Sequence, residues 1–162
     1  MYLLRCQLLN WALGVGRFMI KWEIFKELDF PCSDISYKWE SERCARLTVI
    51  LHFSRVIGGY AKDLELTFEN PIAMKWEDES YGLIDLPETL PKCCSEKFMS
   101  WTYPTLIVSN SQWADLYAAR SHTKEDYKNH KVMHFVFISM NDLVHVLSNE
   151  KPSTRLIEST DA

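Results

Sequence analysis

Three consecutive acidic residues, Glu77, Asp78 and Glu79, are the first candidates for chemistry in this chain of 162 residues. Paired carboxylates act as general acid and base in glycoside hydrolysis and hold the metal ions used in phosphate chemistry. Neighbouring side chains on a strand point to opposite faces, so only Glu77 and Glu79 could converge on one substrate. The sequence offers no further partners that this pair would need for catalysis. We therefore expect the acidic stretch to bind a protein and do not expect an enzyme.

Three histidines, His130, His134 and His145, resemble a set of metal ligands. On a strand, residues four positions apart lie about 13 Å from each other, because each residue advances the chain by ~3.3 Å. One metal ion therefore cannot bind both His130 and His134. If the turn between the last two predicted strands has an even number of residues, His134 and His145 share a face and meet diagonally. A third ligand is not evident, so we expect no metal site and no cofactor.

Nucleophilic catalysis has no clear signature in the sequence. Ser121, His122 and Asp126 form a loop triplet without a nucleophile elbow or oxyanion glycines. Phosphate-binding glycine patterns are absent, since GVGRF at residues 14–18 lacks both the third glycine and a preceding strand. The five cysteines are odd in number and have no CxxC spacing, which predicts reduced thiols, including the adjacent Cys93 and Cys94, and a cytoplasmic location.

The composition is that of a soluble globular domain. Apolar residues make up 47% of the chain, charged residues 25% and aromatic residues 13%, and the aromatic share favours sheets. The net charge of −4 has the wrong sign for a nucleic-acid partner. The apolar N-terminal run is interrupted by Arg5, Gln7 and Asn10 and is too short to span a membrane. We expect neither nucleic-acid nor membrane binding.

The domain organisation predicted from the sequence is simple. Residues 1–18 are either a short amphipathic helix or an extension that precedes a start at Met19. Residues 19–152 contain no repeat and no linker, which predicts a single α+β domain. Residues 153–162 follow a proline and are expected to be a frayed tail.

Several segments alternate apolar and polar residues as strands do. DISYKWE at residues 34–40 is typical of a half-buried strand, and CARLTVILHFSRV at residues 44–56 of a central strand buried on both faces. VMHFVFIS at residues 132–139 and LVHVLS at residues 143–148 predict a terminal hairpin around a short turn.

One segment, SNSQWADLYAAR at residues 109–120, has the pattern of a helix. Ser109 and Gln112 have the spacing of a capping box, and Trp113, Leu116 and Tyr117 form an apolar stripe. Together with the strands, this predicts an α+β fold of mainly antiparallel β structure. We expect a sandwich or a strongly curved sheet with one clear helix near residues 110–120.

The segment LELTFENPIAMKWEDES at residues 64–80 predicts a β-hairpin. A three-residue loop, Glu69 to Pro71, keeps the apolar faces of its two strands on one side, whereas a two-residue loop separates them. The three-residue loop also places Glu65 opposite Lys75, a favourable cross-strand pair worth roughly 0.2–1 kcal/mol.

This register predicts an acidic rim on the molecule. It places Asp63 opposite Glu77, with Asp78 and Glu79 next along the chain, and Tyr81 beside them as an aromatic anchor. From residue 63 to residue 88 there are eight acids and one base, a local charge of −7 in a chain whose total is −4. Such a cluster can steer a basic partner and raise its association rate by ~10 to 10³-fold. We expect these five residues to form a partner-binding site.

The size of the chain, the strand pair at residues 64–80 and the segment HFVFISMNDLVHVLS at residues 134–148 resemble those of small bacterial proteins, both uncharacterised families and immunity proteins that neutralise toxins. Immunity proteins often present an acidic face to a basic nuclease. The resemblance therefore implies stoichiometric inhibition of a basic toxin or nuclease in the cytoplasm. An alternative left open by the sequence is a small-molecule-binding protein or enzyme with an aromatic-lined sheet cavity.

Overall fold

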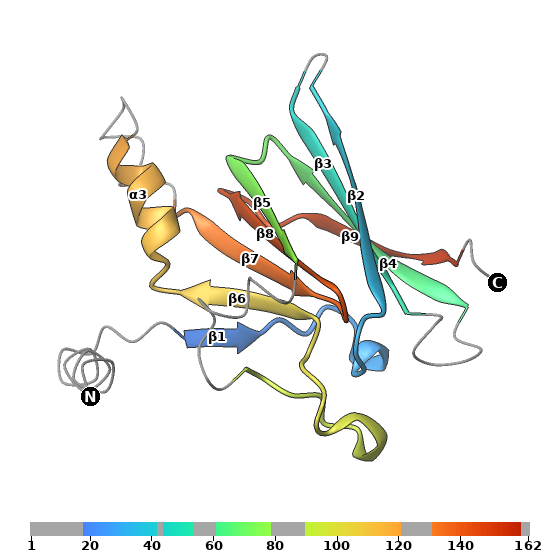
Figure 1. Ribbon diagram of the computed structural model, residues 1–162. Helices are drawn as coiled ribbons and strands as arrows, with labels where there is room; N and C mark the ends of the chain where they lie inside the picture. The colour runs from blue at the N-terminus through green and yellow to red at the C-terminus, as the bar shows by residue number, and fades with distance from the viewer. Residues whose placement is uncertain (1–17, 42–43, 54–60, 79–89, 121–130, 160–162) are drawn as a thin grey trace, which may run out of the picture.

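The computed structural model describes residues 18–41, 44–53, 61–78, 90–120 and 131–159, and within these ranges it is mostly antiparallel β structure with one α-helix (Figure 1). This confirms the predicted fold class. In chain order the elements are β1 (Phe18–Lys21), η1 (Lys26–Leu28), β2 (Asp34–Glu40), β3 (Arg46–His52), β4 (Lys62–Glu69), β5 (Ala73–Asp78), η3 (Glu96–Phe98), β6 (Thr105–Ser109), α3 (Gln112–Arg120), β7 (Met133–Ile138), β8 (Asp142–Ser148) and β9 (Ser153–Glu158).

The strands form two sheets that pack face to face. The five-stranded sheet has the order β1-β6-β7-β8-β5, and the four-stranded sheet has the order β2-β3-β4-β9, with every neighbouring pair antiparallel. Figure 1 shows the two sheets as two layers, with α3 beside the N-terminal end of β7. In the described part of the chain, β2 and β5 are edge strands, one in each sheet.

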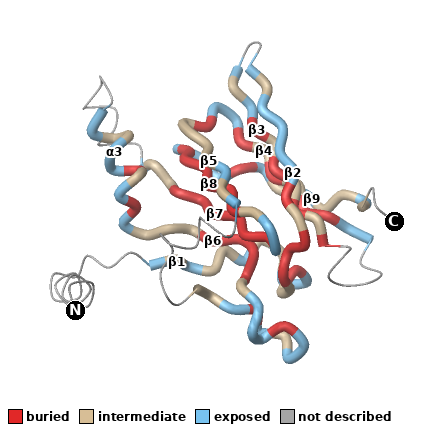
Figure 2. The backbone as a smooth tube through the Cα atoms, in the orientation of Figure 1, coloured by how far each residue is buried: buried red, intermediate tan, exposed pale blue. Residues whose placement is uncertain are grey.

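The main core lies between the sheets, because alternate side chains of the inner strands point inward. Leu47, Val49 and Leu51 of β3 are fully buried, and they meet Phe135 and Phe137 of β7 across the gap. Among the other residues of β3, Arg46 is exposed and the rest are half-buried, so the expectation that this strand is buried on both faces is wrong. Figure 2 shows the buried stretches concentrated where the sheets meet.

The predicted hairpin between residues 64 and 76 does not form. β4 pairs with β3 and β9, whereas β5 lies in the other sheet and pairs with β8. Asn70 adopts a positive φ of 51°, and the N–H of Ile72 already donates to the carbonyl of Leu147 on β8. The chain therefore crosses from one sheet to the other at Asn70 and Pro71. A hairpin and a crossing bury the same alternate positions, so the sequence pattern does not distinguish them.

Several other predictions are resolved by the structure. Residues 153–158 form strand β9 against β4, so the expected frayed tail is wrong for this segment. Helix α3 and the β7–β8 hairpin are confirmed. The predicted N-terminal helix and the loop triplet of Ser121, His122 and Asp126 lie outside the described residues, apart from Phe18, which begins β1. Within the described ranges, the structure contains no helix with the length and apolar character needed to cross a bilayer.

Candidate functional site

Asp63, the first residue of the predicted acidic rim, is buried. It lies near the start of β4 and is only 1% exposed. Its carboxylate accepts hydrogen bonds from His52 Nδ1 at 2.8 Å and from the backbone N–H of Phe53 at 3.2 Å. Asp63 stands opposite Ile157 of β9, so the predicted pairing of Asp63 with Glu77 is wrong. Its carboxylate is held by internal partners and does not belong to a solvent-facing rim.

Glu77, the second predicted residue, faces the outer side of the five-stranded sheet. Its Oε1 forms an ion pair with Lys75 Nζ at 2.8 Å, and its Oε2 lies 3.4 Å from His145 Nε2. Glu79 and Tyr81 lie outside the described residues. Of the five predicted site residues, only Asp78 is both described and exposed.

The half-buried Glu77 ends a chain of polar groups, the histidine network, whose other members, Ser111, His134 and His145, are buried. Ser111 Oγ lies 2.7 Å from His134 Nδ1, and His134 Nε2 lies 3.0 Å from His145 Nδ1. Trp113 of α3 covers both imidazole rings, with ring centroids 5.2 and 6.4 Å away. The diagonal meeting of His134 and His145, expected for an even turn, is confirmed, because four residues separate the paired Ile138 and Leu143.

Burial, followed by the positive charge of Lys75, lowers the pKa of His145 to about 4, so this imidazole is neutral at pH 7. One proton arrangement fits the two hydrogen bonds: Ser111 Oγ–H donates to His134 Nδ1, and His134 Nε2–H donates to His145 Nδ1. His145 Nε2 and Glu77 Oε2 lie 3.4 Å apart, but these two buried atoms form no hydrogen bond. Ser111 Oγ also accepts the N–H of Ala114 and so caps α3. Ser109 was the expected cap, but its hydroxyl bonds the backbone of Phe18 instead. The histidine network thus fastens α3 to the sheet.

A different group of acids gathers where β2, β5 and β8 approach one another. Asp78 ends β5 directly opposite Asp142, the first residue of β8, and Asp34 begins β2 on the neighbouring sheet. Burial raises the pKa of Asp142, and the hydrogen bond from Trp76 opposes this rise. The charge of Asp34, a hydrogen bond between the Asp34 and Asp142 side chains and the charge of Asp78 raise this pKa further. A carboxyl group with a raised pKa destabilises the fold when it is ionised. Asp34 and Asp78 therefore oppose the ionisation of Asp142.

Aromatic side chains are exposed along the same strands. Trp76 of β5 is 48% exposed and donates its indole N–H to Asp142 Oδ1 at 3.0 Å. Tyr37 and Trp39 of β2 are 47% and 44% exposed, although their positions in the strand face the inner side of the sheet. We call the surface formed by Asp34, Asp78, Asp142, Tyr37, Trp39 and Trp76 the acidic edge.

Sequence reasoning missed Asp34 and Asp142. Each is the first residue of a strand, and a strand start is a common place for an aspartate. Only the crossing of the chain at Asn70 and Pro71, which moves β5 beside β8, brings Asp78 to Asp142. An asparagine followed by a proline, as at Asn70, indicates a turn, but it does not indicate that β5 pairs with β8 after that turn.

Metal and ligand sites are not evident elsewhere in the described residues. No group of three metal-binding side chains occurs among them. The four cysteines they contain, Cys32, Cys44, Cys93 and Cys94, are free thiols. A crevice lined by Phe25, Leu28, Phe53, Tyr103 and neighbouring residues is too narrow to admit a water molecule.

Comparisons with protein-family models, with curated proteins and with solved structures find no significant match for this chain.

Proposed function

We propose that this chain is a protein-binding module that docks a basic segment of a partner protein on its acidic edge. The proposal depends on one observation, the placement of Asp78 directly opposite Asp142 with Asp34 close by and with exposed aromatic side chains on the same strands. Like charges directly opposite each other in a sheet are destabilising, so this arrangement is unfavourable for the free protein. A bound cation would remove the repulsion.

The aromatic side chains fit the same kind of partner. Lysine and arginine side chains pack on tryptophan and tyrosine faces through cation–π contacts, worth ≈ 0.5–1 kcal/mol at exposed sites. Trp76 can contribute in two ways. Its indole N–H orients the Asp142 carboxylate, and its half-exposed ring can contact a cation. Tryptophan and tyrosine are also the residues most often found at the energetic centres of protein interfaces.

The partner class that we favour is a basic toxin or nuclease, neutralised by a tight complex in the cytoplasm. The negative charges of the acidic edge would speed its association at low salt. The negative charge of the acidic edge supports this proposal, together with the resemblance of the chain to immunity proteins in size and in the segment at residues 134–148.

The proposal is tested with a fluorescein-labelled peptide of alternating lysine and threonine, titrated with the full chain at 50 and 300 mM salt. The variant D34N/D78N/D142N removes three carboxylates and should bind about tenfold more weakly at low salt, because each exposed ion pair is worth up to about 1 kcal/mol. The matched control is E27Q/E96Q/E150Q, which removes the same charge from exposed positions elsewhere. Its affinity should stay within about threefold of the wild type.

Two results would contradict the proposal. Equal weakening of both triple variants would mean that the peptide responds to net charge alone. Unchanged binding of D34N/D78N/D142N at 50 mM salt would mean that the acidic edge is not the docking surface.

A further inference from the structure

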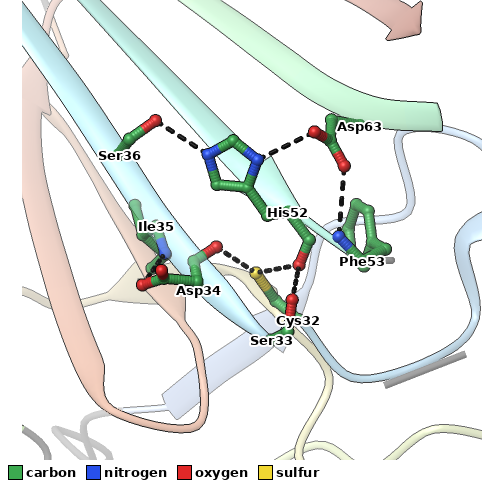
Figure 3. A network of polar contacts seen from close by, with 8 residues as sticks. All are labelled: Cys32, Ser33, Asp34, Ile35, Ser36, His52, Phe53 and Asp63. Carbon is green, nitrogen blue, oxygen red and sulfur yellow. Dashed lines mark hydrogen bonds and ion pairs between the residues drawn. The ribbon is translucent and has the colours of Figure 1, made fainter. Parts of the chain in front are cut away.

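A second polar network lies on the outer face of the four-stranded sheet, the face that points away from the core (Figure 3). Its members, Ser36, His52 and Asp63, are connected in the order of a nucleophile, a base and an orienting acid. Ser36 Oγ lies 2.8 Å from His52 Nε2, and His52 Nδ1 lies 2.8 Å from Asp63 Oδ2. The second oxygen of Asp63 accepts the backbone N–H of Phe53 at 3.2 Å.

Three adjacent strands position these side chains. Ser36 is on β2, His52 ends β3 and Asp63 is near the start of β4, and β3 lies between the other two. Neighbouring side chains on a strand point to opposite faces. The neighbours Ile35, Leu51 and Leu64 point into the core, so the side chains of Ser36, His52 and Asp63 point away from it. The His52 imidazole therefore bridges the two neighbouring strands, contacting Ser36 on β2 through Nε2 and Asp63 on β4 through Nδ1.

Exposure changes in the order that nucleophilic catalysis requires. Asp63 is buried, the side chain of His52 is 18% exposed, and Ser36 is open to solvent. A carboxylate only accepts hydrogen bonds, so its contact with Nδ1 fixes the imidazole proton on that nitrogen. The lone pair of Nε2 is then directed at Ser36 Oγ, and the serine proton points to it.

We propose that Ser36 is a nucleophile activated by His52, with Asp63 as the positioning residue, and that it reacts with small activated acyl esters on this open face. Ser36 Oγ attacks the ester carbonyl carbon as its proton passes to His52 Nε2. The tetrahedral intermediate collapses, the bond to the leaving alkoxide breaks, and His52 returns the proton to that group. Water then repeats the sequence on the acyl-serine, which releases the carboxylic acid and restores Ser36.

The backbone beside Ser36 can supply a donor for the oxyanion. The N–H of Ile35 donates to the Asp34 carboxylate at 2.9 Å. N–H groups of alternate strand residues point the same way, so the N–H of Tyr37 is directed to the open edge of β2 as well. This is the N–H of the residue after the nucleophile, the position that serves the oxyanion in nucleophile elbows. A single donor predicts slow turnover and favours small substrates with good leaving groups.

The test is covalent labelling of the full chain with a fluorophosphonate probe, followed by peptide mass spectrometry. Ser36 Oγ displaces fluoride from phosphorus, His52 takes the proton, and the adduct remains on the serine because it is not hydrolysed. We expect one adduct at Ser36 and a slow release of p-nitrophenol from p-nitrophenyl acetate. Both should be lost in Ser36→Ala, which changes an exposed side chain and should keep the fold.

The base and the positioning residue are tested separately. In His52→Asn the side-chain amide can still donate to Asp63, but it offers no base to Ser36, so labelling should fall by at least 100-fold. Asp63→Asn should lower the labelling rate at least tenfold while circular dichroism shows an unchanged fold. The matched control is Ser153→Ala, an exposed serine of β9 on the same sheet, which should label at the wild-type rate.

Labelling that persists in Ser36→Ala, or a wild-type chain that gives no Ser36 adduct, would overturn the proposal. The aspartates of the acidic edge are unchanged in Ser36→Ala, so this result and the peptide-binding result can fail independently of each other.

Discussion

The histidine network and the acidic edge both contain ionisable side chains, but they differ in how those side chains are arranged. In the histidine network, Ser111, His134 and the neutral His145 are joined by hydrogen bonds beneath the indole of Trp113, and Glu77 lies 3.4 Å from His145. At the acidic edge, Asp78 and Asp142 stand directly opposite each other and carry the same charge. Buried polar groups must find partners within the protein, whereas exposed charges are also accessible to partners from outside.

The difference indicates which region holds the fold and which is free to act. Breaking the histidine network should weaken the fold, because its groups are buried and each depends on the next. Removing charge from the acidic edge should leave the fold intact or strengthen it, because the like charges repel. The sign of the stability change therefore separates the two regions.

The largest expected effect is the loss of stability on acidification that depends on His145. Its folded pKa of about 4 lies below its ordinary value of 6.5, so the unfolded chain binds the proton first. The stability contributed by this group is present above pH 6.5 and is lost as the pH falls toward 4, by about 3 kcal/mol. Urea unfolding at pH 7 and pH 4 should show this loss in the wild type and a smaller loss in His145→Asn. Equal losses would show that the imidazole is not held neutral.

A smaller effect is expected at the helix cap of the histidine network. Ser111→Ala removes the acceptor for the Ala114 N–H and the partner of His134, and should lower the free energy of unfolding by about 1 kcal/mol. Ser153→Ala, at an exposed position on β9, should change it by less than about 0.5 kcal/mol. Chemical denaturation of both variants checks the comparison. Equal changes in the free energy of unfolding for Ser111→Ala and Ser153→Ala would contradict the role of Ser111 as a helix cap.

The smallest effect should have the opposite sign. Asp142→Asn removes a carboxyl group whose ionisation is opposed by burial and by Asp34 and Asp78, while the asparagine oxygen can still accept the Trp76 indole N–H. It should raise the free energy of unfolding by roughly 0.2–1 kcal/mol at pH 7 and low salt. The gain should shrink in 0.5 M salt, where exposed charges are screened. A loss of stability at low salt would mean that the acidic edge carries no electrostatic strain.

Much of the fold could be predicted from local patterns. The alternation in residues 34–40 gives β2 at its observed bounds, and the apolar stripe of residues 113–117 lies within α3. The partner of β4 could not be predicted. Leu64, Leu66 and Phe68 would be expected to point into the core whether β4 paired with β9, as it does, or with β5. Pairing depends on contacts between distant segments, and the period of a strand carries no information about them.

The candidate site was predictable only in part. Asp78 was identified because it belongs to a dense run of acids, and it does lie at an exposed strand end. Asp63 was placed wrongly, because its burial depends on a hydrogen bond with His52, eleven residues earlier on a different strand. The same bond creates the Ser36–His52–Asp63 arrangement, which has no signature in the sequence, since its members come from three strands.

The most direct test of the acidic edge is an NMR titration of ¹⁵N-labelled protein with the lysine–threonine peptide. The indole N–H of Trp76 reports on Asp142 through their 3.0 Å hydrogen bond. We predict that this signal and the amides of Asp34, Asp78 and Asp142 shift first, while those around the Glu65–Arg155 ion pair on β4 and β9 stay in place. Shifts centred on β9, with the Trp76 indole signal unmoved, would contradict the account.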